Sequence, residues 1–138
     1  MLQTILLVDK DTLFAEQMRQ IFMGAGFRVL HTRSETEASD IFSAIKPDVL
    51  ITDVMLHHPD GGFCLAWQLK RKYPDVPVIM ISSVTWHTEL YFHLNTPGAR
   101  DWIKADVYLD KPVRPEELMA AVQGVLHLRA ATRDTPEC

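Results

Sequence analysis

Five short apolar runs with helical patterns between them are the feature that most limits how this sequence can fold. The runs span residues 5–8, 27–30, 49–51, 78–81 and 107–109. Most of them are continuously apolar, as expected for strands that are buried on both faces of a parallel sheet. Strands that alternate with helices favour right-handed crossovers, which place helices on both faces of the sheet. The sequence therefore predicts a single α/β domain built on a five-stranded parallel sheet.

The segments between the runs carry recognisable helix ends. Asp11 fits the N-cap of the first helix, which Gly24 or Gly26 would end. The second helix opens on a capping-box pattern at 34–37. The last helix begins at 114–117, where a proline and two acids suit the exposed amide groups of a first turn. These signals predict helices in the gaps between the strands.

Composition and charge narrow the classes of function. The chain has 138 residues, of which 47% are hydrophobic and 23% are charged, which suits one compact core. The net charge is -4 and no basic cluster stands out, so we expect no direct contact with nucleic acid. No run is long enough to span a membrane, and Cys64 and Cys138 lack metal or redox spacing. We expect a cytoplasmic domain at 1–129 and a disordered tail at 130–138.

Polar residues gather where the predicted strands end. Asp9 follows the first run, Asp53 the third, Ser82 the fourth and Lys111 the fifth. In open parallel sheets, ligands bind beyond the carboxyl ends of the strands, so these side chains should meet at one edge. Two carboxylates, a hydroxyl and an ammonium suit phosphoryl transfer, where a carboxylate can act as nucleophile and negative charge must be neutralised.

In these features the chain resembles the receiver domains of two-component response regulators, from residue 5 to about residue 129. The resemblance is carried by the segments L-L-V-D, K-P-D-V-L-I-T-D-V-M-L, D-G-G-F, Y-P-D-V-P-V-I-M-I-S-S, A-D-V-Y-L-D-K-P and R-P-E-E-L. It implies a doubly wound, flavodoxin-like sheet with strand order 2-1-3-4-5. It also implies a signalling domain rather than an enzyme. A histidine kinase or phosphotransfer protein would donate the phosphoryl group, and an output domain or downstream protein would respond.

The resemblance assigns roles to the acidic residues. Asp53 matches the phosphoacceptor. Asp9, Asp53 and the backbone carbonyl of Met55 match the ligands of a magnesium ion, a metal that favours carboxylate and carbonyl oxygens. An aspartate after a strand can also simply cap the next helix, and this is the role that we expect for Asp11.

Three further residues match functional positions of the family. Ser82 matches the hydroxyl that contacts the phosphoryl group, and Ser83 takes this role if the strand ends one residue later. Lys111 matches the lysine that pairs with the phosphoryl oxygens, next to a cis peptide bond before Pro112. Tyr108 matches the aromatic switch residue, although packing alone would explain an aromatic residue in a strand equally well.

The main departure from the family is Lys10, which stands where the second acid of the metal-binding pair is expected. Lys10 and Lys111 balance the charges of the two carboxylates before any metal binds. Two unit charges ~4 Å apart interact by up to ~4 kcal/mol at an effective dielectric of ~20, so Lys10 should weaken magnesium binding. Either its ammonium replaces part of the metal's charge beside Asp53, or the domain acts mainly as a binding module.

Two other departures lie in the loops. An extra residue falls in the segment H-H-P-D-G-G-F. The stretch 84–104 is longer than the family spacing and rich in aromatic residues, which predicts an altered partner surface, with extra core as the alternative. We expect His57, His58, His87 and His93 to be solvated rather than to bind a metal.

Other functions remain in competition with a phosphorylated receiver. A degenerate receiver would bind its partner without phosphorylation. A haloacid-dehalogenase-like phosphatase also begins with an aspartate-x-aspartate motif, but its threonine comes two positions after the second aspartate, whereas Thr12 follows directly. The chain also has little room for the cap domain of such a phosphatase. A homodimer through the last helix is compatible with its apolar residues Met119, Leu126 and Leu128.

Overall fold

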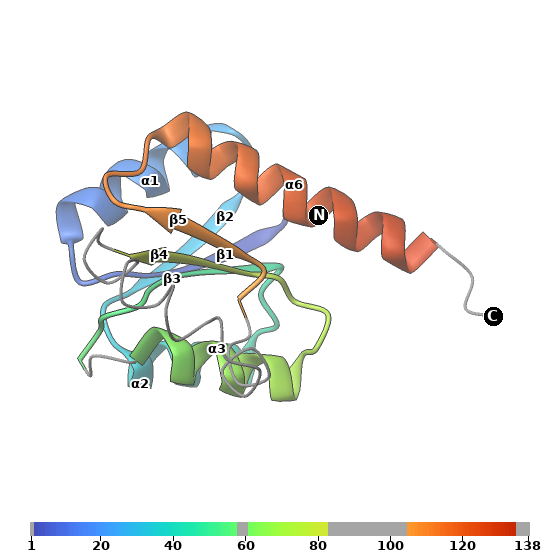
Figure 1. Cartoon of the computed structure of the whole chain (residues 1–138), viewed down its shortest axis with the longest axis horizontal. Coiled ribbons are helices and arrows are strands. Elements are labelled where there is room, and N and C mark those ends of the chain that lie inside the picture. The colour runs from blue at the N-terminus through green and yellow to red at the C-terminus, as the bar shows by residue number, and fades with distance from the viewer. Residues whose placement is uncertain (1, 58–60, 83–104, 135–138) are drawn as a thin grey trace.

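The computed structural model describes residues 2–57, 61–82 and 105–134, which form a parallel sheet between two layers of helices (Figure 1). The strands are β1 (Thr4–Val8), β2 (Arg28–Thr32), β3 (Val49–Asp53), β4 (Val78–Ser82) and β5 (Val107–Asp110). The helices are α1 (Thr12–Gly24), α2 (Glu35–Ala44), α3 (Gly61–Lys72) and α6 (Pro115–Asp134). The strand order is 2-1-3-4-5 and all neighbouring strands are parallel, which confirms the predicted flavodoxin-like sheet.

Two helices begin at the caps that the sequence predicts. The carboxylate of Asp11 accepts a hydrogen bond from the backbone N–H of Phe14 at 3.1 Å. The hydroxyl of Ser34 accepts one from the N–H of Glu37 at 3.2 Å. Each cap satisfies an amide that the helix itself leaves without a partner. The cap at Asp11 also defines the short turn between β1 and α1, in which Asp9 and Lys10 lie.

The far ends of two helices follow different signals. α1 ends at Gly24, and Gly26 adopts a φ of 94°, a left-handed conformation that glycine takes without a steric penalty. α6 continues to Asp134, so it includes residues 130–134, which the sequence analysis places in a tail. Ala130 and Ala131 favour a helix, and no glycine or proline interrupts the chain there.

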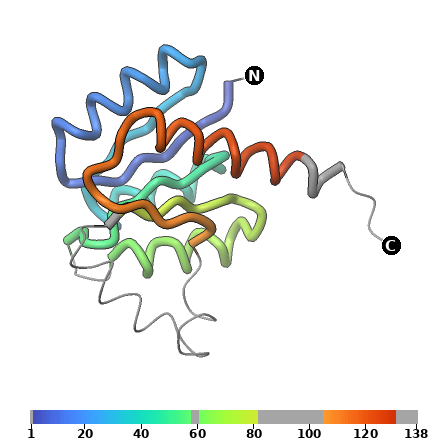
Figure 2. Tube along the Cα trace, turned by 45° about the horizontal axis from the view of Figure 1, so that its top comes forward, coloured from blue at the N-terminus to red at the C-terminus, as the bar shows by residue number. Residues whose placement is uncertain are grey.

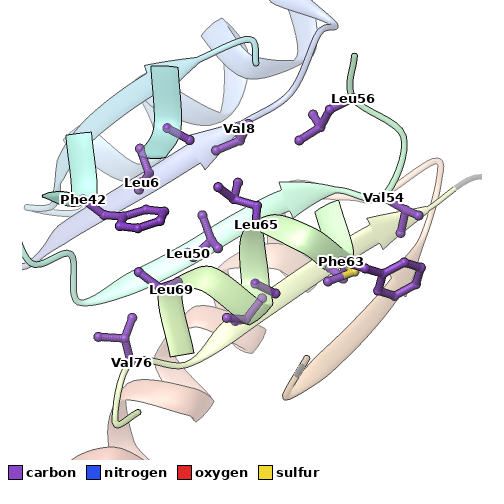
Figure 3. Packing of buried hydrophobic residues seen from close by; sticks show 14 residues of the cluster. Leu6, Val8, Phe42, Leu50, Val54, Leu56, Phe63, Leu65, Leu69 and Val76 are labelled. Atoms are coloured by element: carbon purple, nitrogen blue, oxygen red, sulfur yellow. The ribbon is translucent and has the colours of Figure 1, made fainter. Parts of the chain in front are cut away.

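Two apolar clusters fill the space on either side of the sheet. α1 and α6 cover one face, and α2 and α3 cover the other (Figure 1). Along β1, Leu6 and Val8 belong to the cluster under α2 and α3, and Ile5 and Leu7 to the cluster under α1 and α6. Figure 3 shows side chains of the first cluster meeting between the helices and the sheet. This alternation explains why the strands are apolar on both faces.

α6 extends past the edge of the sheet (Figure 2) and is tied to it near its far end by Arg129. The guanidinium donates to the carbonyl oxygen of Asp48 at 3.1 Å, to the Oδ1 atom of Asp48 at 3.2 Å and to Oδ2 of Asp75 at 3.0 Å. Asp48 and Asp75 precede β3 and β4, so this anchor lies at the amino ends of the strands, away from the predicted site.

Most of the apolar residues that the sequence suggested for a homodimer surface on α6 pack inside the domain instead. Met119 and Leu126 pack against the core cluster, whereas Leu128 is 66% exposed.

Among the described residues, no helix combines the length and the apolar character that crossing a bilayer requires.

Candidate functional site

The strand register places two carboxylates side by side at the carboxyl edge of the sheet. The last residue pair between β1 and β3 joins Val8 to Thr52. Asp9 and Asp53 are the next residues on the two strands, so they emerge at the same edge on neighbouring strands. The predicted meeting of the two acids therefore follows from the pairing of β1 with β3, which the sequence alone does not show.

The pairing of β4 with β5 brings two more predicted residues to this edge. The last pair joins Ser82 to Asp110, and Lys111 follows directly. Ser82 is the final residue of β4, as the sequence analysis expects, whereas Ser83 lies outside the described residues. The peptide bond between Lys111 and Pro112 is cis, as the resemblance implies.

The ammonium of Lys111 contacts both carboxylates. Its Nζ atom donates a hydrogen bond to Oδ2 of Asp53 at 2.9 Å and lies 3.4 Å from Oδ2 of Asp9. Burial by itself would lower the pKa of Lys111, but the hydrogen bond to Asp53 and the charges of both carboxylates outweigh burial and raise it. The lysine therefore stays cationic and neutralises part of the charge at the site.

Asp9 is a buried carboxylate with unused acceptor capacity. It is 1% exposed, and its Oδ1 atom accepts a hydrogen bond from the backbone N–H of Asp11 at 2.8 Å. Its Oδ2 atom is buried without a hydrogen-bond partner in the described part of the chain, and it lies 3.4 Å from the Lys111 ammonium, within ion-pair distance. Burial raises the pKa of Asp9, opposed by the Asp11 amide and by Lys111. A second cation would be stabilised at this oxygen.

Asp53 is more accessible than Asp9 and is oriented by its neighbours. Its side chain is 14% exposed, and its Oδ1 atom accepts a hydrogen bond from the N–H of Met55 at 3.3 Å. The buried hydroxyl of Thr52 donates to the Asp53 carbonyl oxygen at 2.9 Å. A carboxylate that is both held in place and open to solvent is suited to attack an incoming group.

A glycine on α3 allows this helix to pack against the chain that follows Asp53. The N–H of Gly62 donates to the carbonyl oxygen of Val54 at 2.8 Å. A Cβ atom at Gly62 would overlap the Asp53 carbonyl oxygen and approach the Val54 Cα atom to 2.8 Å. The close approach of two backbones therefore requires glycine here, inside the D-G-G-F motif.

Lys10, which the sequence analysis expects in place of a second acid, does not contact the carboxylates. Lys10 is exposed, and within the described ranges it forms no ion pair. Across those ranges, no group of three or more His, Cys, Asp or Glu side chains could hold a metal. The oxygens available to a cation are those of the Asp9 and Asp53 carboxylates and backbone carbonyls such as that of Met55. The residue Met55 is 37% exposed.

Tyr108 lies in β5 with its ring against the core cluster that contains Phe63 and Met80. Its hydroxyl is buried and has no hydrogen-bond partner in the described part of the chain. This burial raises the pKa of Tyr108. The ring thus points inward, an arrangement compatible with either the packing or the switch interpretation.

Replacing Tyr108 by phenylalanine should leave the free energy of unfolding unchanged or raise it by about 1 kcal/mol, because it removes a buried hydroxyl that lacks a partner. Urea denaturation of both proteins, with the slope compared as well as the midpoint, measures this change. A loss of more than about 1 kcal/mol would show that the hydroxyl forms a stabilising hydrogen bond after all.

Two neighbours of the site were not singled out from the sequence. The ring centroid of Phe14 lies 5.7 Å from the Lys111 ammonium, and Nε2 of His31 lies 3.1 Å from the Asp9 carbonyl oxygen. Neither Phe14 nor His31 belongs to a motif that the sequence analysis used. His58, His87, His93 and the stretch 84–104 lie outside the described residues.

Comparison with known proteins identifies the family. A family model described as the response regulator receiver domain matches residues 5–123. The chain belongs to the response regulator receiver domains. Such domains are signalling parts of two-component systems rather than enzymes in the usual sense. This membership confirms the resemblance on which the sequence analysis relies.

Curated relatives of this receiver domain are longer than the chain. It is 30% identical over 127 residues to the DNA-binding response regulator MtrA of Mycolicibacterium paratuberculosis, covering 91% of this chain and 52% of the relative. It is 30% identical over 133 residues to the response regulator MprA of Mycobacterium bovis, covering 96% of this chain and 54% of the relative. The chain thus spans about half the length of these relatives.

Solved structures show the same fold. A CheY-like response regulator receiver domain protein from Methanospirillum hungatei superposes with a TM-score of 0.81 over 96% of this chain and 99% of that chain, at 24% identity. A response regulator receiver protein from Sinorhizobium medicae superposes with a TM-score of 0.73 over 93% of this chain and 97% of that chain, at 25% identity.

Proposed function

We propose that this receiver domain accepts a phosphoryl group on Asp53 and thereby switches a partner protein or an output domain in two-component signalling. The observation that carries the proposal is the environment of Asp53. Its carboxylate is reachable from solvent, with the Lys111 ammonium at 2.9 Å and the buried carboxylate of Asp9 close by. The phosphodonor would be a histidine kinase or a phosphotransfer protein.

The chemistry requires an attacking oxygen and compensation of negative charge. A carboxylate oxygen of Asp53 would form a bond to phosphorus while the bond between phosphorus and the donor's imidazole nitrogen breaks. The electron pair of that bond stays on the nitrogen, and the imidazole leaves as the neutral ring after taking up one proton from water. The phosphoryl oxygens carry the charge during transfer, and the Lys111 ammonium is positioned to pair with them. The hydroxyl of Ser82 at the end of β4 would contact the same oxygens, and Tyr108 would respond as the switch residue.

A magnesium ion is the cofactor that this site would use. Mg²⁺ is commonly held by one or two carboxylates and several waters, and the buried Oδ2 atom of Asp9, without a hydrogen-bond partner in the described ranges, suits such a cation. Asp9, Asp53 and the backbone carbonyl of Met55 would hold the ion. When bound, it would neutralise phosphoryl oxygens. Lys10, in place of a second acid, would weaken its binding without contacting the carboxylates directly.

A binding module that works without phosphorylation is the second candidate. The observation that favours it is the charge balance, because Lys111 already neutralises part of the charge of Asp9 and Asp53 while Lys10 adds another positive charge at the rim. In this case, the domain would present one fixed surface to its partner.

Intact-mass measurement after incubation with an acyl phosphate separates the two candidates. With Mg²⁺ present, we expect the mass to rise by one phosphoryl group in the wild-type protein and not in Asp53→Asn. Asp40→Asn is a matched control, because Asp40 lies exposed on α2 and its substitution makes the same change in charge. If no adduct forms under any condition, the binding module is favoured. An adduct that forms equally well with a chelator present would show that the transfer does not need a metal.

A further inference from the structure

We propose that Phe14 is a positioning residue for Lys111, which its aromatic ring holds against the carboxylates of Asp53 and Asp9. Only the expected effect of Phe14 on phosphoryl transfer rests on the proposed function of Asp53. The placement of the ammonium itself can be tested in the unmodified protein.

The contacts of Lys111 come from three elements of the fold. Its Nζ atom lies 2.9 Å from Oδ2 of Asp53 on β3, 3.4 Å from Oδ2 of Asp9 after β1, and 5.7 Å from the ring centroid of Phe14 on α1. An ammonium within about 6 Å of a ring centroid is attracted by the negative charge density of the ring face. The aromatic ring therefore adds a third attractive contact to the two carboxylates.

An open pocket beside Lys111 offers its ammonium an alternative, solvated position away from Asp53. The pocket has a volume of ≈ 470 Å³ and is lined by Asp11, Phe14, Gln17, Lys111, Pro112 and Val113. Lysine carries its charge on a flexible four-carbon stem, and an ammonium is strongly hydrated. Without an attractive wall on this side, the ammonium would spend part of its time in the water of the pocket rather than at Asp53.

The ring of Phe14 is itself held from two sides. Its backbone N–H donates to the capping carboxylate of Asp11 at 3.1 Å, which sets the first turn of α1. Its side chain packs against the core cluster that contains Ala15, Met18 and Val113. A ring with both its backbone and its side chain anchored restricts Lys111 without first having to be ordered.

The position of Lys111 matters more here than in a site with several cations. Among the described residues, Lys111 is the cation that contacts the two carboxylates, since Lys10 is exposed and unpaired. Movement of one ammonium group by a few ångströms therefore changes most of the local charge compensation. The contact between Phe14 and Lys111 is a way in which α1 can affect the chemistry without touching Asp53.

Three substitutions test the role of the ring. Phe14→Leu and Phe14→Met keep an apolar side chain against the core but remove the ring face, and Phe14→Tyr keeps the ring face. Leu13→Ala is the matched control, because Leu13 is the neighbouring apolar residue on α1 and is 71% exposed. Circular dichroism and urea denaturation establish that each variant is folded. Two non-aromatic variants are used so that the ring can still be tested if one of them does not fold.

The first measurement needs no phosphorylation. Nitrogen-15 NMR of the Lys111 ammonium should show faster proton exchange with water in Phe14→Leu and Phe14→Met than in wild type, Phe14→Tyr and Leu13→Ala. The second is the initial rate of phosphorylation by an acyl phosphate, which should fall by about 3- to 10-fold in the non-aromatic variants and by less than about 2-fold in Phe14→Tyr.

The outcomes separate this inference from the proposed function. If wild type takes no phosphoryl group but the ammonium signals still change as expected, the positioning role stands and the function of Asp53 fails. If the ammonium exchange is the same in all folded variants, the positioning role is wrong, whatever the phosphorylation rate. An equal loss of rate in Phe14→Tyr and Phe14→Leu would also overturn the positioning role. Phe14→Tyr keeps the aromatic ring and Phe14→Leu removes it, so an equal loss would mean that the ring is not what matters.

Discussion

Replacing Lys10 by aspartate should raise the affinity of the receiver domain for Mg²⁺ by about 100-fold. The substitution changes the charge at the rim of the site by two units, and a charge ~6 Å from a divalent ion contributes ~1.4 kcal/mol per unit even in water-like surroundings. Two units therefore give ~3 kcal/mol, which corresponds to a factor of about 100. Direct binding of the new carboxylate to the ion would add to this. Isothermal titration calorimetry of the unphosphorylated protein measures the affinity without requiring any phosphodonor.

Two further variants separate the causes of this increase. Lys10→Ala removes the positive charge without adding a ligand, so we expect about a 10-fold increase. Arg28→Glu makes the same change in net charge as Lys10→Asp, but it lies at the start of β2, at the opposite edge of the sheet, so its effect should be small. If wild type already binds Mg²⁺ as tightly as Lys10→Asp, Lys10 does not weaken the metal site.

Replacing Gly62 by alanine should lower the free energy of unfolding by about 2–3 kcal/mol, within the range for forcing extra atoms into a packed site. The new methyl group would overlap the backbone carbonyl oxygen of Asp53 and crowd the Val54 Cα atom. Backbone atoms cannot rotate away as the end of a flexible side chain can. α3 would then shift relative to β3, so we also expect the phosphorylation rate of Asp53 to fall. Urea denaturation and the acyl phosphate assay measure the two effects.

Two other glycines provide controls. A Cβ atom at Gly124, within α6, meets no atom within 4 Å, so Gly124→Ala should raise the stability by about 0.5–1 kcal/mol. At Gly61 the three atoms nearest to a Cβ atom belong to the side chain of Glu35, so the crowding there is with the end of a side chain and not with backbone. If Gly62→Ala proves as stable as Gly61→Ala, the backbone contact between α3 and β3 is looser than the structure indicates.

Local signals in the sequence were sufficient for much of the fold. The apolar runs, the caps at Asp11 and Ser34 and the stop at Gly24 or Gly26 each depend on neighbours within a few residues, and the structure has the strands, both caps and the end of α1 at Gly24. The exception is the end of α6, where the loss of an apolar pattern after Arg129 did not stop the helix. Alanine-rich backbone continues a helix without any need for a buried face.

Periodicity did not show which apolar residues would have a function. Leu13 and Phe14 are adjacent on α1 and both fit its apolar pattern, yet Leu13 is 71% exposed and Phe14 packs against the core beside Lys111. The rotation of a helix against a sheet depends on how all its side chains pack, which one short pattern does not determine. The contact between Phe14 and Lys111 joins residues far apart in the chain, so no local signal could reveal it.

By itself, the sequence determined the class of fold, the family and the residues that end each strand, because these depend on short patterns and on their order along the chain. Only the tertiary structure decided how those residues meet. The pairing of β1 with β3 puts Asp9 next to Asp53, and the position of Lys111 bridges them while Lys10 stays exposed. Charges act over a few ångströms in space, and spacing along a chain does not specify those distances.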